Sequence, residues 1–179
     1  MVSATPFIER LFMSVEGITA SMQYLTCKLD EEIFALEILK VREVLEFKKV
    51  TKVPQTPTFM KGVINLRGSV VPVLDMGLKL GMPEVAKTID TCVVIIELVL
   101  AGEPTLLGIL VDAVREVIDL EPNQIDPPPR IGSKLRTDFI KGMGKRDEEF
   151  MILVDLDKVF SAQELAMVQE AGKTVETDP

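Results

Sequence analysis

The chain has 179 residues, with 20 Lys and Arg against 28 Asp and Glu, so its formal net charge is −8; this length can bury a substantial core, in one domain or in two tightly joined halves. The negative charge repels phosphate backbones and anionic headgroups, which argues against nucleic acid as a partner. The chain contains no histidine, so most enzyme and metal-site hypotheses lose their commonest general base and ligand.

Residues 1–20 are expected to form an N-terminal extension to the folded domain. Its apolar residues have the spacing of one face of a short amphipathic helix, namely Phe7, Ile8, Leu11, Phe12 and Val15. A later start at Met13 or Met22 is the alternative. The sequence has neither an apolar run that could span a bilayer nor the apolar core of a signal peptide, so a cytoplasmic protein without membrane insertion is expected.

The first half of the chain predicts two β-hairpins. Residues 23–29 and 32–38 flank a polar pair that suits a tight turn. A second hairpin turns at residues 66–69, where Gly68 supplies the positive φ that a reversal usually requires. This arrangement places Arg67 at the tip of the second hairpin.

The second half of the chain repeats the first in the same order. Val41-Arg42-Glu43-Val44 recurs as Val114-Arg115-Glu116-Val117, and Phe59-Met60-Lys61-Gly62 recurs as Phe139-Ile140-Lys141-Gly142. The offset grows from 73 to 80 residues, which a seven-residue insertion in the proline-rich loop at 121–136 explains. A duplicated unit of short strands predicts two small β-barrels side by side, with a groove between them.

The duplication sets the expected boundaries. Residues 21–172 form one domain, with the first barrel at about 21–87 and the second barrel at about 88–160. The segment between the halves, at 77–90, contains two glycines and a proline and is expected to be a helical turn followed by a linker.

The end of the chain predicts a helix. Ser161 and Glu164 have the spacing of a capping box, so a C-terminal helix is expected at about 161–171. Gly172 is expected to end this helix, and residues 173–179 are expected to be a disordered tail.

Few residues suggest chemistry. Asp75 and Asp155 occupy equivalent places, but each follows a strand and precedes a short helical segment, which favours helix caps over a catalytic carboxylate pair. Cys27 and Cys92 lie far apart in apolar strands, which predicts buried thiols rather than a metal or redox site. Because a phosphate-binding glycine loop is also missing, the sequence indicates a protein that is not an enzyme and uses no metal or cofactor.

The tip of the first repeat carries the strongest binding candidate. Arg67 either forms fork-like bonds with a partner's carboxylates or carbonyls, or points into water from a well-formed turn. Val41 and Glu43 leave a similar choice, since alternation either turns both outward toward a partner helix or makes them the end of a strand. The residues alone leave both alternatives open.

The first repeat resembles the signature of the CheW family of bacterial chemotaxis coupling proteins. The resemblance rests on the run Phe59-Met60-Lys61-Gly62-Val63-Ile64-Asn65-Leu66-Arg67-Gly68 and its continuation Val71-Pro72-Val73-Leu74-Asp75. It covers about residues 22–170. It implies a mainly β fold of two intertwined five-stranded Src-homology-3-type β-barrels, pseudo-duplicated, with short connecting helices and a C-terminal helix, and no catalytic activity.

The resemblance also implies partners and the residues that bind them. Proteins similar to this chain bind the cytoplasmic tip of methyl-accepting chemoreceptors and the regulatory domain of the histidine kinase CheA, in arrays beneath the membrane. The implied receptor-binding residues, in the groove between the barrels, are Val41, Glu43, Val44, Gly62, Asn65, Leu66, Arg67 and Gly68. The implied kinase-binding residues, in the proline loop, are Arg130 and Ile131.

Two alternatives remain at this stage. Within the family, the chain could couple receptors to a kinase of another pathway, such as one for surface motility or development, and neighbouring genes would separate the two. Outside it, a small molecule could bind in the groove, which a turnover screen or a co-purified ligand would reveal.

Overall fold

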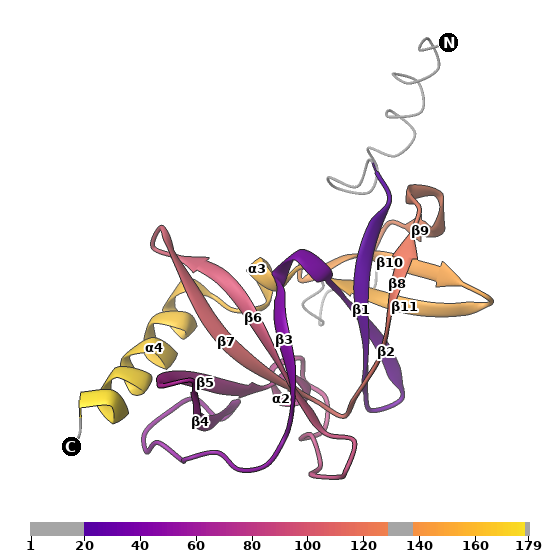
Figure 1. The fold of residues 1–179 in the computed structure, drawn as a ribbon. Helices are drawn as coiled ribbons and strands as arrows, with labels where there is room; N and C mark the ends of the chain where they lie inside the picture. Colours follow the sequence, from indigo (N-terminus) through magenta and orange to yellow (C-terminus); the bar gives the residue numbers. More distant parts are fainter. Residues whose placement is uncertain (1–19, 129–137, 178–179) are drawn as a thin grey trace.

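The computed structural model describes residues 20–128 and 138–177. They form a mainly β protein with short helices (Figure 1). The helices are the 3-10 helices η1 (Ile38–Lys40) and η2 (Pro122–Gln124) and the α-helices α2 (Met76–Lys79), α3 (Leu156–Val159) and α4 (Ala162–Thr177). The strands are β1 (Met22–Leu29), β2 (Glu32–Glu37), β3 (Val41–Glu46), β4 (Met60–Leu66), β5 (Ser69–Asp75), β6 (Cys92–Leu100), β7 (Glu103–Val111), β8 (Ala113–Leu120), β9 (Ile125–Asp126), β10 (Ile140–Arg146) and β11 (Glu149–Val154).

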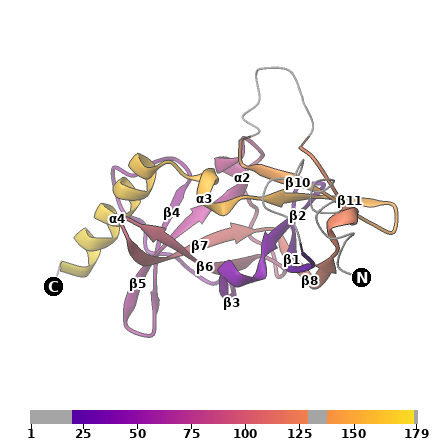
Figure 2. The same ribbon diagram turned by 90° about the horizontal axis from the view of Figure 1, so that it is seen from above.

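The strands form two mixed sheets that lie side by side (Figures 1 and 2). Sheet A has the order β8-β1-β2-β11-β10-β9, and sheet B has the order β3-β6-β7-β5-β4. Most neighbours are antiparallel, but β11 runs parallel to β2 and β5 runs parallel to β7. The predicted mainly β fold class is confirmed, and the two-residue strand β9 adds a sixth strand to sheet A.

Each sheet takes strands from both halves of the chain. Strand β3 forms its ladder with β6 of the second half, and β8 forms its ladder with β1 of the first half. The boundary predicted near residue 87, which would give each half its own barrel, is therefore wrong. The intertwining that the resemblance implied is confirmed, because neither repeat completes a sheet without strands of the other.

The duplication recurs in backbone detail. The register of β3 against β6 shifts at Arg42, and the register of β8 against β1 shifts at Arg115. Lys61 in β4 and Lys141 in β10 mark a second pair of equivalent shifts. A β-bulge adds one residue to a strand and increases its twist. The repeated motifs therefore specify the same two bends in each repeat.

The two predicted hairpins of the first half are present, with tight two-residue turns. In the turn between β4 and β5, Arg67 has φ +52° and Gly68 has φ +88°. Two successive residues with positive φ match the right-handed twist of the flanking strands. Gly68 thus has the predicted role, and the same turn holds Arg67 in a left-handed conformation that non-glycine residues seldom adopt.

Asp75 and Asp155 are helix caps, as predicted. The Asp75 carboxylate accepts hydrogen bonds from the amides of Leu78 in α2 and of Val85, both at 3.0 Å. The Asp155 carboxylate accepts one from the amide of Asp157 in α3 at 3.1 Å. Because Asp75 is fully buried, it also fixes the connection that follows α2 against the end of β5.

Strands β1 and β2 bury both of their faces. Tyr24 belongs to a small cluster inside sheet A, whereas its neighbour Leu25 belongs to the large cluster that extends into sheet B. Cys27 lies completely buried in that large cluster, and its burial raises the pKa of the thiol to about 12. The predicted buried thiol is confirmed for Cys27, whereas Cys92 is partly exposed.

Helix α4 lies against sheet B at the end of the molecule away from sheet A (Figure 2). The predicted capping box is confirmed, because Ser161 Oγ accepts from the Glu164 amide at 3.0 Å and Glu164 Oε1 accepts from the Ser161 amide at 2.9 Å. Lys79 Nζ donates to Glu164 Oε2 at 2.7 Å. This partly buried ion pair ties the first turn of α4 to α2.

The predicted end of this helix at Gly172 is wrong. Helix α4 continues to Thr177, so residues 173–177 are helical rather than part of a disordered tail. Gly172 is buried, and a Cβ placed on it would lie 3.7 Å from Cγ of Pro72 in β5. The glycine therefore lies where helix and strand pack closely, instead of providing a left-handed helix end.

Some predictions concern residues outside the described part of the chain. They include the N-terminal extension, apart from its last residue, and the implied kinase contacts Arg130 and Ile131. Within residues 20–128 and 138–177, no helix combines the length and the apolar character needed to cross a membrane.

Gly62 is a position where the fold requires glycine. Its φ is +150°, and a Cβ there would lie 2.3 Å from the carbonyl oxygen of Thr51. We expect Gly62→Ala to lower the free energy of unfolding by about 2–4 kcal/mol, because backbone on both sides would have to move. Urea unfolding followed by circular dichroism measures this change.

Gly81→Ala is the matched control for that substitution. Gly81 also has a positive φ, +77°, but nothing lies within 4 Å of the position that a Cβ would occupy there. Its substitution should cost only about 1 kcal/mol, from the left-handed conformation. Equal losses in the two variants would show that the contact with Thr51 is not what matters.

Candidate functional site

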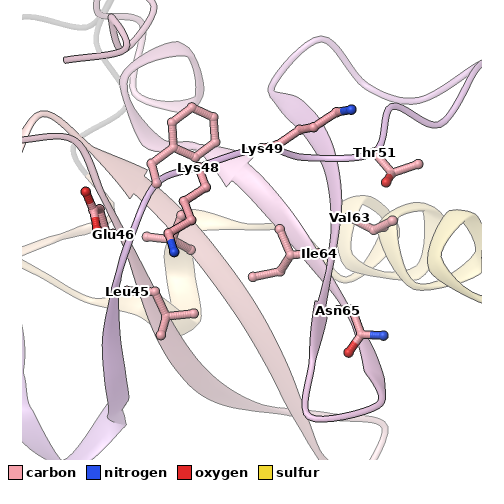
Figure 3. A pocket seen from close by; sticks show the side chains of 10 residues that line it. Leu45, Glu46, Lys48, Lys49, Thr51, Val63, Ile64 and Asn65 are labelled. Carbon is pink, nitrogen blue, oxygen red and sulfur yellow. The ribbon is translucent and has the colours of Figure 1, made fainter. Parts of the chain in front are cut away.

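The two edge strands of sheet B face each other across an open groove. Strands β3 and β4 stand at opposite ends of the strand order, so the curved sheet brings its two edges together without a continuous ladder. We call this groove the seam. Its lining, most of which is labelled in Figure 3, consists of Leu45, Glu46, Phe47, Lys48, Lys49, Thr51, Val63, Ile64, Asn65 and Val93.

The seam is joined at two points. Thr51, beyond the end of β3, exchanges two backbone hydrogen bonds with Val63 of β4, at 2.8 and 2.9 Å. Toward the start of β3, the Glu43 carboxylate accepts two hydrogen bonds from Arg67, at 2.6 Å from Nη1 and 3.0 Å from Nη2. A backbone bridge and a two-bond side-chain fork therefore connect the edges on either side of the opening.

The fork unites two of the predicted binding residues. Hydrogen bonds from Arg67 lower the pKa of Glu43, and the same bonds raise the pKa of Arg67. The Arg67 side chain is 73 % exposed and that of Glu43 is 26 % exposed. Arg67 thus has guanidinium surface available to a partner while Glu43 holds its orientation.

The turn beside the fork is stabilised by another predicted residue. Asn65 Oδ1 accepts a hydrogen bond from the amide of Gly68 at 2.8 Å. Such side-chain bonds within a turn hold residues that need positive φ. Asn65 and Gly68 therefore support the conformation that presents Arg67.

Three of the predicted binding residues gather at the two edges of sheet B. Glu43, Asn65 and Arg67 surround an opening between two strands of the same sheet. Gly62 is buried under Thr51, so it does not provide an open approach for a partner helix. Val44 has the opposite burial from its neighbours Glu43 and Leu45, which places it on the other face of β3.

The other predicted apolar residues are only partly exposed. Val41 and Leu66 both pack against the large hydrophobic cluster. They lie near the fork in sequence, and neither forms the lining of the seam.

Sequence reasoning missed the apolar lining of the seam. Leu45 and Ile64 line it, together with Val93 of β6. The alternation that starts at Glu43 would have found Leu45, since it is two residues further along the same face. Val93 could not be found in this way, because it comes from the other repeat.

Sheet A has a groove of its own, lined by residues of β8, β1, β2, β11 and β10. Glu116, which matches Glu43 in the repeat, pairs with Arg146 at 3.2 Å. A second pair links Arg115 and Glu149 at 2.5 Å, so two ion pairs cross this groove. The groove is lined by Thr26, Ile33, Arg115, Glu116, Arg146, Asp147, Glu149 and Met151.

The described residues offer no metal site, because no group of three His, Cys, Asp or Glu side chains among them could hold an ion. Both strongly shifted groups are buried: burial raises the pKa of Cys27 to about 12, and burial with the nearby charge of Glu37 raises that of Tyr24 to about 12. Neither belongs to the seam.

Comparison with known proteins gives a consistent result. The family model described as "CheW-like domain" matches residues 23–164. A chemotaxis protein CheW of Klebsiella aerogenes is 35% identical over 158 residues, which is 88% of this chain and 93% of that protein. One of Rhizobium meliloti is 31% identical over 137 residues, 76% of this chain and 86% of that protein.

A solved structure agrees with these relatives. The crystal structure of the scaffolding protein TtCheW from Thermoanaerobacter tengcongensis has a TM-score of 0.69 and 35% sequence identity, over 80% of this chain and 94% of that one. The two intertwined mixed β-sheets define a mainly β domain with the fold of that scaffolding protein. The chain belongs to the CheW-like domain family.

The Glu43–Arg67 fork makes a prediction about ionisation. Glu43 has a pKa below that of an unperturbed carboxyl, about 4.3, and in Arg67→Ala its pKa should rise because the hydrogen bonds from Arg67 are lost. Since the folded pKa is below the unfolded value, the contribution of the fork is present above about pH 4.3 and is lost as the pH falls through the folded pKa. A carboxyl carbon NMR titration measures both values.

Arg146→Ala is the control for this titration. It removes the matching ion pair of sheet A and should leave the Glu43 pKa unchanged. Glu97, whose pKa is lowered by its own hydrogen bond from Arg42, is the internal reference. An unaltered Glu43 pKa in Arg67→Ala would mean that the fork does not persist in solution.

Proposed function

We propose that this protein is a non-catalytic adaptor that couples methyl-accepting chemoreceptors to the histidine kinase CheA in chemotaxis. Membership of the CheW-like family and relatives named chemotaxis protein CheW support this function. Its place would be the cytoplasm, beneath the membrane that holds the receptors. The observation that carries the proposal is the exposed guanidinium of Arg67, held by Glu43 beside the seam of sheet B.

The geometry suits a helical partner. A receptor tip is a helical hairpin, and a helix recognises a surface through apolar residues on one face and polar residues at its rim. Two partly exposed apolar residues lie near the fork in sequence, Leu66 next to Arg67 and Val41 two residues before Glu43. Arg67 can bind helix carbonyls or carboxylates with the guanidinium surface that Glu43 leaves free.

Arg67→Glu tests the proposal directly. The residue is exposed at a hairpin tip, so the variant should fold normally, but capture of receptor signalling tips in a pull-down should fall by about tenfold or more. Retained capture by the folded variant would remove Arg67 from the receptor interface.

Arg42→Glu is the matched control. Arg42 forms the same type of fork with Glu97, at 2.6 and 3.2 Å, on the neighbouring strand β6. Arg42 is exposed and does not line the seam. Its variant loses an equivalent ion pair and should keep receptor capture.

A charge-swap variant distinguishes a direct contact between Arg67 and the receptor from a role of the ion pair in fixing the turn. Combining Glu43→Arg with Arg67→Glu can restore an ion pair between the two positions, with the positive and negative charges exchanged. If Arg67 contacts the receptor, capture stays weak in the swapped protein. If the ion pair only fixes the turn, capture returns.

The kinase side of the proposal rests on residues outside the described part of the chain. Arg130 and Ile131 match the kinase-binding position of the family's proline loop. We expect Ile131→Glu to impair assembly of receptor, kinase and coupler into rings, because a charge would replace an apolar contact. Binary receptor binding should remain in a co-sedimentation assay, and its loss would place the proline loop at the receptor interface.

A further inference from the structure

Both edges of the seam present backbone groups to the opening. The amide of Phe47 donates to the carbonyl of Thr91, beyond the start of β6, at 3.1 Å. Since backbone groups along a strand point alternately to its two sides, the amides and carbonyls of Val44 and Glu46 point away from β6 and toward the seam. Strand β3 has no ladder on that side.

The edge of β4 also directs backbone amides and carbonyls toward the seam, but over a shorter length. Val63 uses its amide and carbonyl to bond with Thr51, so Asn65, two residues further on, directs its own to the same side. Strand β4 then ends at Leu66, and the two-residue turn begins. The length of strand edge that faces the seam without a partner strand is therefore greater on β3 than on β4.

The apolar residues that line the seam can contact every second side chain of an extended peptide. Leu45 and Ile64 provide apolar surface (Figure 3), and Val93 adds to it. Side chains of an extended peptide alternate between its two faces, so every second residue would contact this surface. The stretch of β3 and its continuation from Glu43 to Lys49 is about 20 Å long at ~3.3 Å per residue, enough for about six peptide residues.

The charge at the seam contrasts with the charge of the whole chain. The seam is lined by Lys48 and Lys49 against one acidic residue, Glu46, on a chain of net charge −8. Both lysines are exposed, and no carboxylate among the described residues forms an ion pair with either. Lys87 adds a third cation, with Nζ 2.9 Å from the carbonyl oxygen of Lys48 and 5.6 Å from the Phe47 ring centre.

We propose that the seam binds a short extended peptide of a partner protein, in which acidic and apolar residues alternate, by adding it as a strand to the outer edge of β3. The backbone amides and carbonyls of Val44 and Glu46 that have no partner strand pair with the peptide backbone, as in other cases of strand addition. Apolar peptide residues contact Leu45 and Ile64, and acidic ones pair with Lys48 and Lys49. This site is distinct in ligand class from the helical receptor tip, and it does not depend on the proposed coupling function.

A fluorescein-labelled peptide of seven residues, alternating Val and Glu, is the probe. Fluorescence anisotropy should detect its binding to the full chain, and a peptide with Lys in place of Glu should not bind. Lys48→Glu combined with Lys49→Glu should weaken binding by about tenfold or more, because two attractive charges become repulsive. Lys28→Glu, an exposed lysine of sheet A, is the matched control and should change binding by less than about twofold.

Backbone methylation separates strand addition from other modes. Methylating the amides of one alternate set of peptide residues removes the donors that face β3, whereas the other set points away. One set should abolish binding and the other should be tolerated. A peptide bound as a helix would be sensitive to methyl groups in both sets.

Hydrogen exchange reports the site itself. On binding, the amides of Val44 and Glu46 should exchange more slowly, because they gain hydrogen-bond partners. The proposal is overturned if the Val-Glu peptide does not bind, if the Lys peptide binds equally, if both methylated sets behave alike, or if these two amides keep their exchange rates.

Discussion

Strand exchange between the two repeats is the constraint on which the rest of the structure depends. Strand β3 has its ladder partner β6 in the second repeat, and β8 has its partner β1 in the first. Neither repeat can satisfy the backbone groups of these strands alone. The large hydrophobic cluster follows from this pairing, since it joins Leu25 of sheet A to residues of sheet B such as Ile95. We infer that the two sheets fold as one cooperative unit.

The exchange also shapes the seam of sheet B and the groove of sheet A. Because the strand that carries the Val-Arg-Glu-Val motif pairs with the other repeat on one side, its other side meets the edge formed by its own repeat's later hairpin. An ion pair then crosses each meeting point, Glu43 with Arg67 in sheet B and Glu116 with Arg146 in sheet A. The duplicated glutamates thus have the same structural place, but the arginines come from positions that do not match in the repeat.

The different positions of Arg67 and Arg146 in the repeats account for the difference between the seam of sheet B and the groove of sheet A. In sheet B the arginine occupies the turn itself, where Gly68 and Asn65 hold it outward. In sheet A the turn residues are Asp147 and Glu148, and the arginine precedes them in β10. Among the described residues, the seam of sheet B therefore combines a guanidinium that is 73 % exposed with an apolar lining and with strand edges that have no partner strand. The groove of sheet A is crossed by two ion pairs that compete with any ligand for the same charges.

Much of the fold could be predicted from local patterns, and the errors have a common cause. The repeated motifs, the alternating apolar residues and the capping box of Ser161 depend on neighbours along the chain, so they were visible in the sequence. The end of α4, the role of Gly62 and the division into barrels depend on which distant segments meet. Gly172 does not stop its helix because the helix packs on Pro72 there, and Gly62 is required because Thr51 crosses it.

The residues of the candidate site likewise divide into those that local patterns predict and those that depend on the pairing of distant strands. The position of Arg67 at the tip of its hairpin could be predicted, since a two-residue turn with Gly68 must present the residue before the glycine. Its partner Glu43 is 24 residues away, and the alternation of β3 alone did not show that it faces the turn of β4 and β5. Leu45 follows from that alternation once Glu43 is placed, whereas Val93 follows only from the exchange of strands. A binding surface built across two repeats is therefore specified by pairing as much as by its own motif, and a substitution in β6 can alter the seam without touching the signature residues.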